Sequence, residues 1–146
     1  MHMTARILPV LMFLVFAAGC SGKSAGPKEK WPEKPADGAP LVIEFVKIAG
    51  QGDDTRAELK VFNFEDKDVM RLHMTLHYLD ASGKELKDFP WSVQANPVVG
   101  AKKSAVIEAG AFLPKETASV KVDLRSVQFD GGGKWEPAKK AEEPTK

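Results

Sequence analysis

The sequence predicts an all-β fold, an antiparallel sandwich of two sheets, and three observations lead to this prediction. Apolar side chains recur at every second position in several short segments, which is the pattern of strands with one buried face. Clusters of glycine, aspartate and proline, which are typical of turns, separate these segments. Residues 40–135, which contain all of these segments, are long enough for one hydrophobic core.

Two strands open this domain. In 41–45 (LVIEF) the first, third and fifth side chains are apolar. In 56–61 (RAELKV) Ala57, Leu59 and Val61 alternate with charged side chains. Each segment is therefore expected to bury one face and to expose the other.

A hairpin is expected next. The third strand covers 72–78, and the turn sequence 80–83 (DASG) places a glycine where a positive φ is expected. The returning strand, 89–93, contains Pro90, which has no amide hydrogen and therefore favours an edge strand or a bulge. Segment 102–112 is a poorer strand. Its alternate positions from 105 to 111 are apolar (Ala, Ile, Ala, Ala), and a glycine near its end weakens it.

Segment 120–129 is the clearest strand in the sequence. Its apolar parity shifts after Leu124, the residue expected in the core at its centre, so a bulge or kink is expected near Ser126. The turn sequence 130–133 (DGGG) should bring 134–135 back beside the end of this strand as a short closing strand. About seven short strands separated by turn signals predict an immunoglobulin-like sandwich.

Two stretches also resemble a known family. The run 76–83 (LHYLDASG) and the ending 127–131 (VQFDG) with Trp135 resemble bacterial envelope domains of the FxLYD kind. The sequence departs from that pattern by inserting Leu79 and by carrying Leu76 in place of the leading phenylalanine. The resemblance implies an immunoglobulin-like fold and assigns no biochemical role.

The first twenty residues resemble a bacterial lipoprotein signal. Arg6 precedes the apolar segment 7–19, which is too short to span a bilayer as a helix and is therefore expected to be a signal peptide, residues 1–19. Residues 17–20 (AAGC) resemble the lipobox, so the resemblance implies cleavage before Cys20 and a diacylglycerol on its sulfur. If the cell has an outer membrane, the resemblance implies sorting to its periplasmic face, because Ser21 stands where a retention signal has an aspartate.

The alternative is an ordinary secretory signal, because Ala17 and Gly19 also fit a small-x-small cleavage rule. Cys20 would then be a free thiol. It is the only cysteine in the chain, so it has no intramolecular disulfide partner. Lipid attachment explains this cysteine better, and the lipid on Cys20 is expected to anchor the chain in a membrane of the cell envelope.

Polar segments flank the predicted domain. Residues 20–39, the lipidated N-terminus and a flexible tether, are rich in glycine, proline, lysine and serine. Trp31 is expected to be solvated, and the alternative is that it packs against the domain or the membrane interface. The tail, 136–146, has a similar composition and is expected to be disordered. Removal of Arg6 with the signal leaves 20 basic and 20 acidic residues, so the mature chain has no basic excess for nucleic acid.

One set of residues suggests a metal. Met70, His73, Met74 and His77 would share one face of a helix, and thioether and imidazole groups suit copper. On a strand, the two histidines lie about 13 Å apart and Met74 points to the opposite face. The strand pattern of the neighbouring segments favours this second interpretation, so no metal site and no cofactor are expected.

Other candidates are weaker. Glu65, Asp66 and Asp68 lack the glycine and the distal glutamate of an EF-hand, which indicates a solvated acidic turn. The glycines at 131–133 lack the Lys-Ser/Thr pair of a P-loop. No base stands evidently beside a serine or cysteine nucleophile, so the chain is not expected to be an enzyme.

Two classes of function remain from the sequence. In the first, the sandwich is a non-catalytic interaction or structural module that contacts another envelope protein or its own copies through a sheet face or edge. In the second, it binds a small ligand or a metal. The sequence favours the first class, and an enclosed polar pocket would favour the second.

Overall fold

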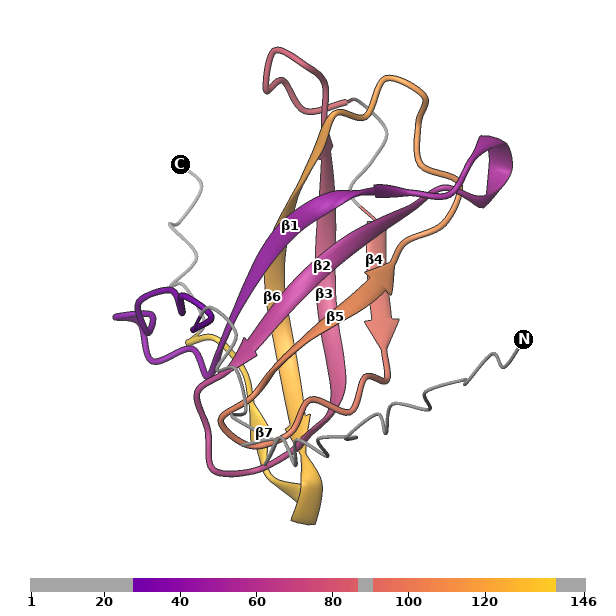
Figure 1. The fold of residues 1–146 in the computed structure, drawn as a ribbon. Helices are drawn as coiled ribbons and strands as arrows, with labels where there is room; N and C mark the ends of the chain where they lie inside the picture. Colours follow the sequence, from indigo (N-terminus) through magenta and orange to yellow (C-terminus); the bar gives the residue numbers. More distant parts are fainter. Residues whose placement is uncertain (1–27, 87–90, 139–146) are drawn as a thin grey trace, which may run out of the picture. The chain divides into compact units, whose positions relative to one another are not determined.

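The computed structural model describes residues 28–86 and 91–138 of the 146-residue chain. The described residues from Trp31 onward belong to one compact unit, and they contain strands and short 3-10 turns but no α-helix. The strands are β1 (Leu41–Ala49), β2 (Arg56–Asn63), β3 (Val69–Leu79), β4 (Trp91–Ala95), β5 (Ser104–Ala109), β6 (Ser119–Phe129) and β7 (Lys134–Trp135) (Figure 1).

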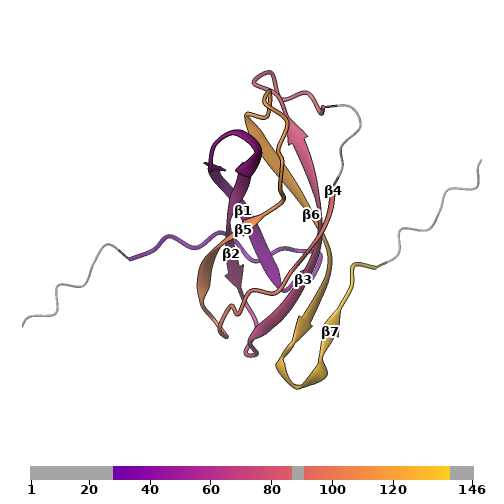
Figure 2. The ribbon, with the colours of Figure 1, turned by 90° about the vertical axis from the view of Figure 1, so that its right-hand side faces the viewer.

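These strands form two antiparallel sheets. The first has the order β1-β2-β5 and the second the order β4-β3-β6-β7. Figure 2 shows the two sheets facing each other. Because β2 pairs with β5 and β3 with β6, the chain crosses between the sheets as in immunoglobulin-like sandwiches. The predicted all-β, antiparallel two-sheet sandwich of about seven strands is confirmed.

The core lies between the inward faces of the sheets. Leu59 and Val61 of β2 belong to the same buried cluster as Leu72, Met74 and Leu76 of β3. All five side chains are fully buried, which agrees with the alternation in the sequence. The phenol of the neighbouring Tyr78 is also in this cluster, and burial raises its pKa.

The weaker predicted strand, 102–112, is shorter in the structure. β5 covers only Ser104–Ala109, because Lys102 and Phe112 have φ of 54° and Gly110 has φ of 79°. These angles lie in the left-handed region, which does not continue a strand. The predicted inward parity is confirmed, since β5 pairs in register with the buried strand β2.

The predicted bulge in the last long strand is confirmed. β3 and β6 pair His73 with Ser126 and Met74 with Leu124, so Arg125 is the extra residue. The closing strand is confirmed as well, with Trp135 opposite Val127. The hairpin partner β4 is an edge strand, as the proline predicted; Phe89 and Pro90 themselves lie outside the described residues.

Asn63 ties together the loops at the end of β2. Its side chain is fully buried, and its amide nitrogen donates to the carbonyl oxygens of Lys67 and Gly100 at 2.8 and 3.0 Å. Its side-chain oxygen accepts from the backbone N–H of Glu65 at 3.0 Å. A buried amide with these partners fixes the loops without leaving polar groups unsatisfied.

Candidate binding edge and cleft

The second sheet has a strand edge that its own chain covers only in part. β7 pairs with β6 at Val127 and Gln128 alone. The rest of β6, from Ser119 to Ser126, has a ladder partner on one side, β3, among the residues that the structure describes. An edge of this kind presents unpaired N–H and C=O groups to another strand.

The sequence explains why β7 is so short. Continuing β7 would place Glu136 and Pro137 beside β6, but a proline has no amide hydrogen to donate to a ladder. Pro137 therefore ends the pairing two residues after Trp135 and leaves the middle of β6 uncovered.

The backbone bonds of β3 show which groups of β6 face this edge. The N–H of Leu86 donates to the carbonyl oxygen of Tyr78 at 2.9 Å, so the backbone of Tyr78 faces away from β6. Successive residues of a strand face opposite sides, so His77 faces β6 and pairs with Lys121. The backbone of Val122, the next residue along β6, therefore faces the open edge.

A cleft of about 630 Å³ lies along the same edge. Its lining comes from the start of β1 and the segment before it, from β6, and from the chain at and after β7: Asp37, Ala39, Leu41, Val122, Asp123, Leu124, Arg125, Trp135, Pro137 and Ala138. Leu124 was expected in the core, but it is only half buried because it lines this cleft. The sequence pattern gives the inward direction of this side chain but not the gap beside it.

The side chains on the opposite face of β6 are charged. Lys121, Asp123 and Arg125 follow one another with alternating sign, and the Lys121 ammonium lies 3.9 Å from the Asp123 carboxylate. Arg125 is oriented by a hydrogen bond from its Nε to the Thr75 hydroxyl at 3.0 Å. The free edge thus combines the apolar side chains of Val122 and Leu124 with a row of mixed charge, and Asp123 and Arg125 of that row also border the cleft.

His77 lies beside this charged row. Its Nδ1 is 2.6 Å from the Glu85 carboxylate and its Nε2 is 3.0 Å from the Asp123 carboxylate. Because carboxylates accept hydrogen bonds, both contacts are hydrogen bonds when both ring nitrogens carry hydrogen. Neither nitrogen then offers a lone pair to a metal or a substrate. These partners escaped the sequence analysis because Asp123 comes from a distant strand.

The predicted strand geometry of the methionine and histidine set is confirmed. Met74 is fully buried, Met70 and His73 are exposed, and His77 is partly exposed. His73 contacts the Ser92 hydroxyl of β4 at 3.1 Å instead of facing His77. Within 28–86 and 91–138, no group of three or more histidine, cysteine, aspartate or glutamate side chains is arranged to hold a metal ion.

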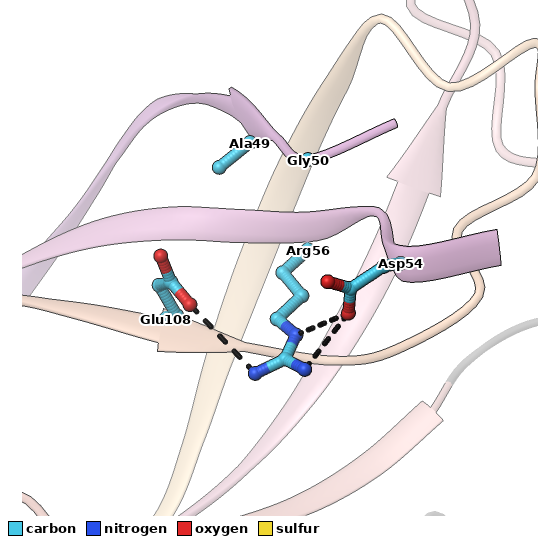
Figure 3. A pocket seen from close by; sticks show the side chains of 5 residues that line it. All are labelled: Ala49, Gly50, Asp54, Arg56 and Glu108. Carbon is cyan, nitrogen blue, oxygen red and sulfur yellow. Dashed lines mark hydrogen bonds and ion pairs between the residues drawn. The ribbon is translucent and has the colours of Figure 1, made fainter. Parts of the chain in front are cut away.

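A second hollow lies where β1 turns into β2 (Figure 3). It measures about 160 Å³, and Arg56 points into it between two carboxylates. The guanidinium donates to Asp54 at 2.8 and 3.2 Å and lies 3.7 Å from Glu108. With two carboxylates already beside the cation, this hollow does not suit an anion.

The acidic residues after β2 have separate structural partners. Glu65 pairs with Lys34 at 3.3 Å, Asp66 lies 3.5 Å from Lys102, and Asp68 accepts the backbone N–H of Ala101 at 2.8 Å. Their carboxylates therefore point to different partners, which agrees with an acidic turn rather than a calcium loop.

Trp31 corrects the expectation for the N-terminal segment. Its ring packs edge-on against Phe62 and Phe64, with centroid distances of 5.4 and 5.2 Å, so the prediction of a solvated side chain is wrong. Phe62 has the outward parity of β2 yet is 1% exposed, because Trp31 covers it. The sequence carried one signal of this packing: Phe62 places a large aromatic side chain at an outward position of β2, where another segment has to cover it.

The predicted signal and lipid site, residues 1–20, lie outside the described residues. The described ranges contain no helix of the length and hydrophobicity needed to cross a membrane.

Comparisons with known proteins add little to the sandwich. No family model matches the sequence, and no curated protein matches it. Among solved structures, the chain is similar to a DUF1425 family member from Shewanella sp. pv-4, with 14% identity, a TM-score of 0.41, and coverage of 58% of this chain and 76% of that one. It is also similar to Northeast Structural Genomics Consortium target SoR45, with 11% identity, a TM-score of 0.28, and coverage of 66% and 76%. Likenesses of this size say nothing of activity or partners.

Proposed function

We propose that this protein is a lipid-anchored protein of the cell envelope and that its sandwich is a non-catalytic interaction module. In this proposal, a partner protein adds an extended segment to the free edge of β6. The observation that carries the proposal is that β7 pairs with only two residues of β6 and leaves a cleft beside the rest. Main-chain hydrogen bonds would supply affinity, and the cleft would select alternate side chains.

The polar clusters support a non-catalytic role. Both ring nitrogens of His77 contact carboxylates, and the guanidinium of Arg56 is held between Asp54 and Glu108. With both nitrogens in contact with carboxylates, the His77 ring would have to exchange one of these contacts before it could accept a proton from a substrate. The cleft is open along the strand, a shape that suits an extended chain better than an enclosed small ligand.

The anchor is proposed from the lipobox resemblance of 17–20, with Cys20 carrying the lipid and, in a cell with an outer membrane, the domain on the periplasmic face of that membrane. Two acyl chains suffice for stable attachment. Because Trp31 packs on the sandwich, the lipid on Cys20 and the domain are joined by eleven residues, whose covalent length is at most about 40 Å. A partner of the β6 edge would therefore lie in the same envelope layer.

Site-specific photo-crosslinking in intact envelopes tests this function. A photoreactive residue at Lys121, on the β6 edge, is expected to give protein adducts. The matched control is Val106, which is exposed on β5 at the far edge of the other sheet. Adducts at Lys121 should disappear in Val122→Pro, because the proline removes an amide hydrogen that faces the open edge.

Equal adducts at Lys121 and Val106, or none at Lys121, would contradict the proposal. Circular dichroism of Val122→Pro must retain the β-type spectrum. If it does not, Val122→Lys replaces it, since an inward charge at an edge also blocks strand addition.

A further inference from the structure

The sequence of the β6 edge is complementary to itself. From Val120 to Arg125 it reads VKVDLR, so apolar side chains alternate with a basic, an acidic and a basic one. The apolar residues alternate with the charged ones along the strand, and Asp123 and Arg125 border the cleft together with Val122 and Leu124. Natural edges are often protected by charged side chains, lysine especially, whereas on this edge the charges alternate in sign and can pair with a second copy.

Antiparallel pairing of two such edges about a two-fold axis gives a small number of registers. With Val122 on the axis, Lys121 lies opposite the second copy's Asp123. With Leu124 on the axis, Asp123 lies opposite the second copy's Arg125. Only the register between them, centred on Asp123, sets like charges against each other, and opposed like charges destabilise a strand pair.

We propose that the strand that occupies the β6 edge is β6 of a second copy of this chain, which joins the two four-stranded sheets into one. This inference rests on the proposed function, whose partner it names. The symmetric contact is isologous and closes at two copies. It pairs the backbone groups of Val122 and Leu124 that face the edge, and it brings the half-buried side chains of the two clefts together.

The chain's own tail is a poorer occupant. The described chain ends at Ala138 beside the cleft, so residues 139–146 start close enough to reach β6. Their sequence, KKAEEPTK, contains no large apolar side chain to fill the cleft and includes a second proline. Pro137 already interrupts the ladder at the point where the tail would begin to pair.

A shared membrane would support this contact. An edge of about seven residues extends roughly 24 Å, and pairing along one such strand buries less area than the usual interface of about 1,600 Å². Two copies anchored in one bilayer gain effective concentration without further contacts. The pairing is therefore expected to be weak in dilute solution and populated in the envelope.

Charge exchange between two copies tests the inference. Two full-length copies with different tags are produced together, and the amount of one that co-purifies with the other from detergent-solubilised envelopes is measured. Lys121→Glu with Arg125→Glu makes the edge acidic, and Asp123→Lys makes it basic. Each altered chain paired with itself should co-purify at least about tenfold less than wild type, and the acidic chain mixed with the basic chain should recover the wild-type level.

The inference is overturned if the same amount co-purifies in all combinations, or if the mixed acidic and basic pair co-purifies no better than each altered chain with itself. Should Asp123→Lys fail to fold, the single variants replace it: Lys121→Glu keeps the Leu124-centred register and Arg125→Glu keeps the Val122-centred one. Each single variant must then retain pairing that the double variant loses. Photo-crosslinks from Lys121 to a protein of different mass, without any at twice the mass of this chain, would leave the proposed function intact and overturn only self-pairing.

Discussion

Trp31 lies edge-on over Phe62, with 5.4 Å between the ring centroids. The contact joins a segment that reads as a polar tether to the outward face of β2. It keeps the Phe62 side chain, which is 1% exposed, away from water on a face of β2 that would otherwise be solvated. The folded unit thus begins before β1.

The first prediction tests this contact. Trp31→Ala should lower the free energy of unfolding by about 2 kcal/mol. This is less than the cost of truncating a fully buried aromatic side chain, because Trp31 is only half buried. Denaturant unfolding of residues 21–146, produced without the signal segment, measures it. Phe112→Ala is the control, since that side chain is 69% exposed and its loss should change little. Equal effects of the two substitutions would contradict the assigned packing.

A second prediction concerns the turn between β1 and β2. Gly50 has φ of 84°, and a Cβ at this position would overlap the carbonyl oxygen of Asp54. Gly50→Ala should therefore destabilise the fold by more than the roughly 1–2 kcal/mol of a left-handed residue alone. Gly83→Ala is the matched control, with φ of 82° and open space around its Cβ. Thermal unfolding should separate the two, and the same loss in both would refute the overlap.

The elements that followed from the sequence are those set by local patterns. Alternation in 56–61 gave β2, the parity shift after Leu124 gave the bulge at Arg125, and the glycines after Phe129 gave the closing hairpin. Such patterns depend on neighbours along the chain, so they can be read without knowing the fold.

The features that escaped the sequence depend on residues distant in the chain. Whether Leu124 is buried depends on how much of β6 the two-residue β7 covers, and on where β1 starts. The partners of His77 come from β6 and from the segment after the turn. The packing of Trp31 depends on Phe62, an aromatic side chain on the outward face of β2. No periodicity encodes these contacts, because each joins two separate patterns.

Titration of the β3 turn gives a third prediction. A hydrogen bond from the Ser82 hydroxyl, then one from the Lys84 backbone N–H, lowers the pKa of Asp80. A carboxyl whose pKa is lower in the folded state stabilises the fold above its unfolded pKa and loses that contribution as the pH falls through the folded value. Carboxyl NMR titration should place Asp80 below the ordinary aspartate range, and Ser82→Ala should move it upward. An unchanged midpoint in Ser82→Ala would contradict the assigned cause.

Metal binding is the subject of the fourth prediction. Both ring nitrogens of His77 contact carboxylates. His73, four residues before it on the same strand, contacts Ser92. Titration of the mature chain with copper or zinc should therefore give no tight one-to-one site. Calorimetry measures it, with His73→Ala plus His77→Ala as the control. A tight site that the double variant loses would contradict the geometry described for β3.

The last prediction concerns the anchor, on which the proposed location depends. Cys20→Ser removes the sulfur that would carry diacylglycerol, so the precursor should remain uncut or be released by the ordinary peptidase, which Ala17 and Gly19 also suit. The N-terminal peptide of the wild-type protein should be heavier by a diacylglyceryl group, with a further acyl chain where the cell adds one. The protein should also partition into detergent, because about 0.8 kcal/mol per buried methylene holds it there. Mass spectrometry of that peptide decides the matter, since an unmodified Cys20 on a soluble wild-type protein would remove the anchor and the shared membrane on which weak self-pairing relies.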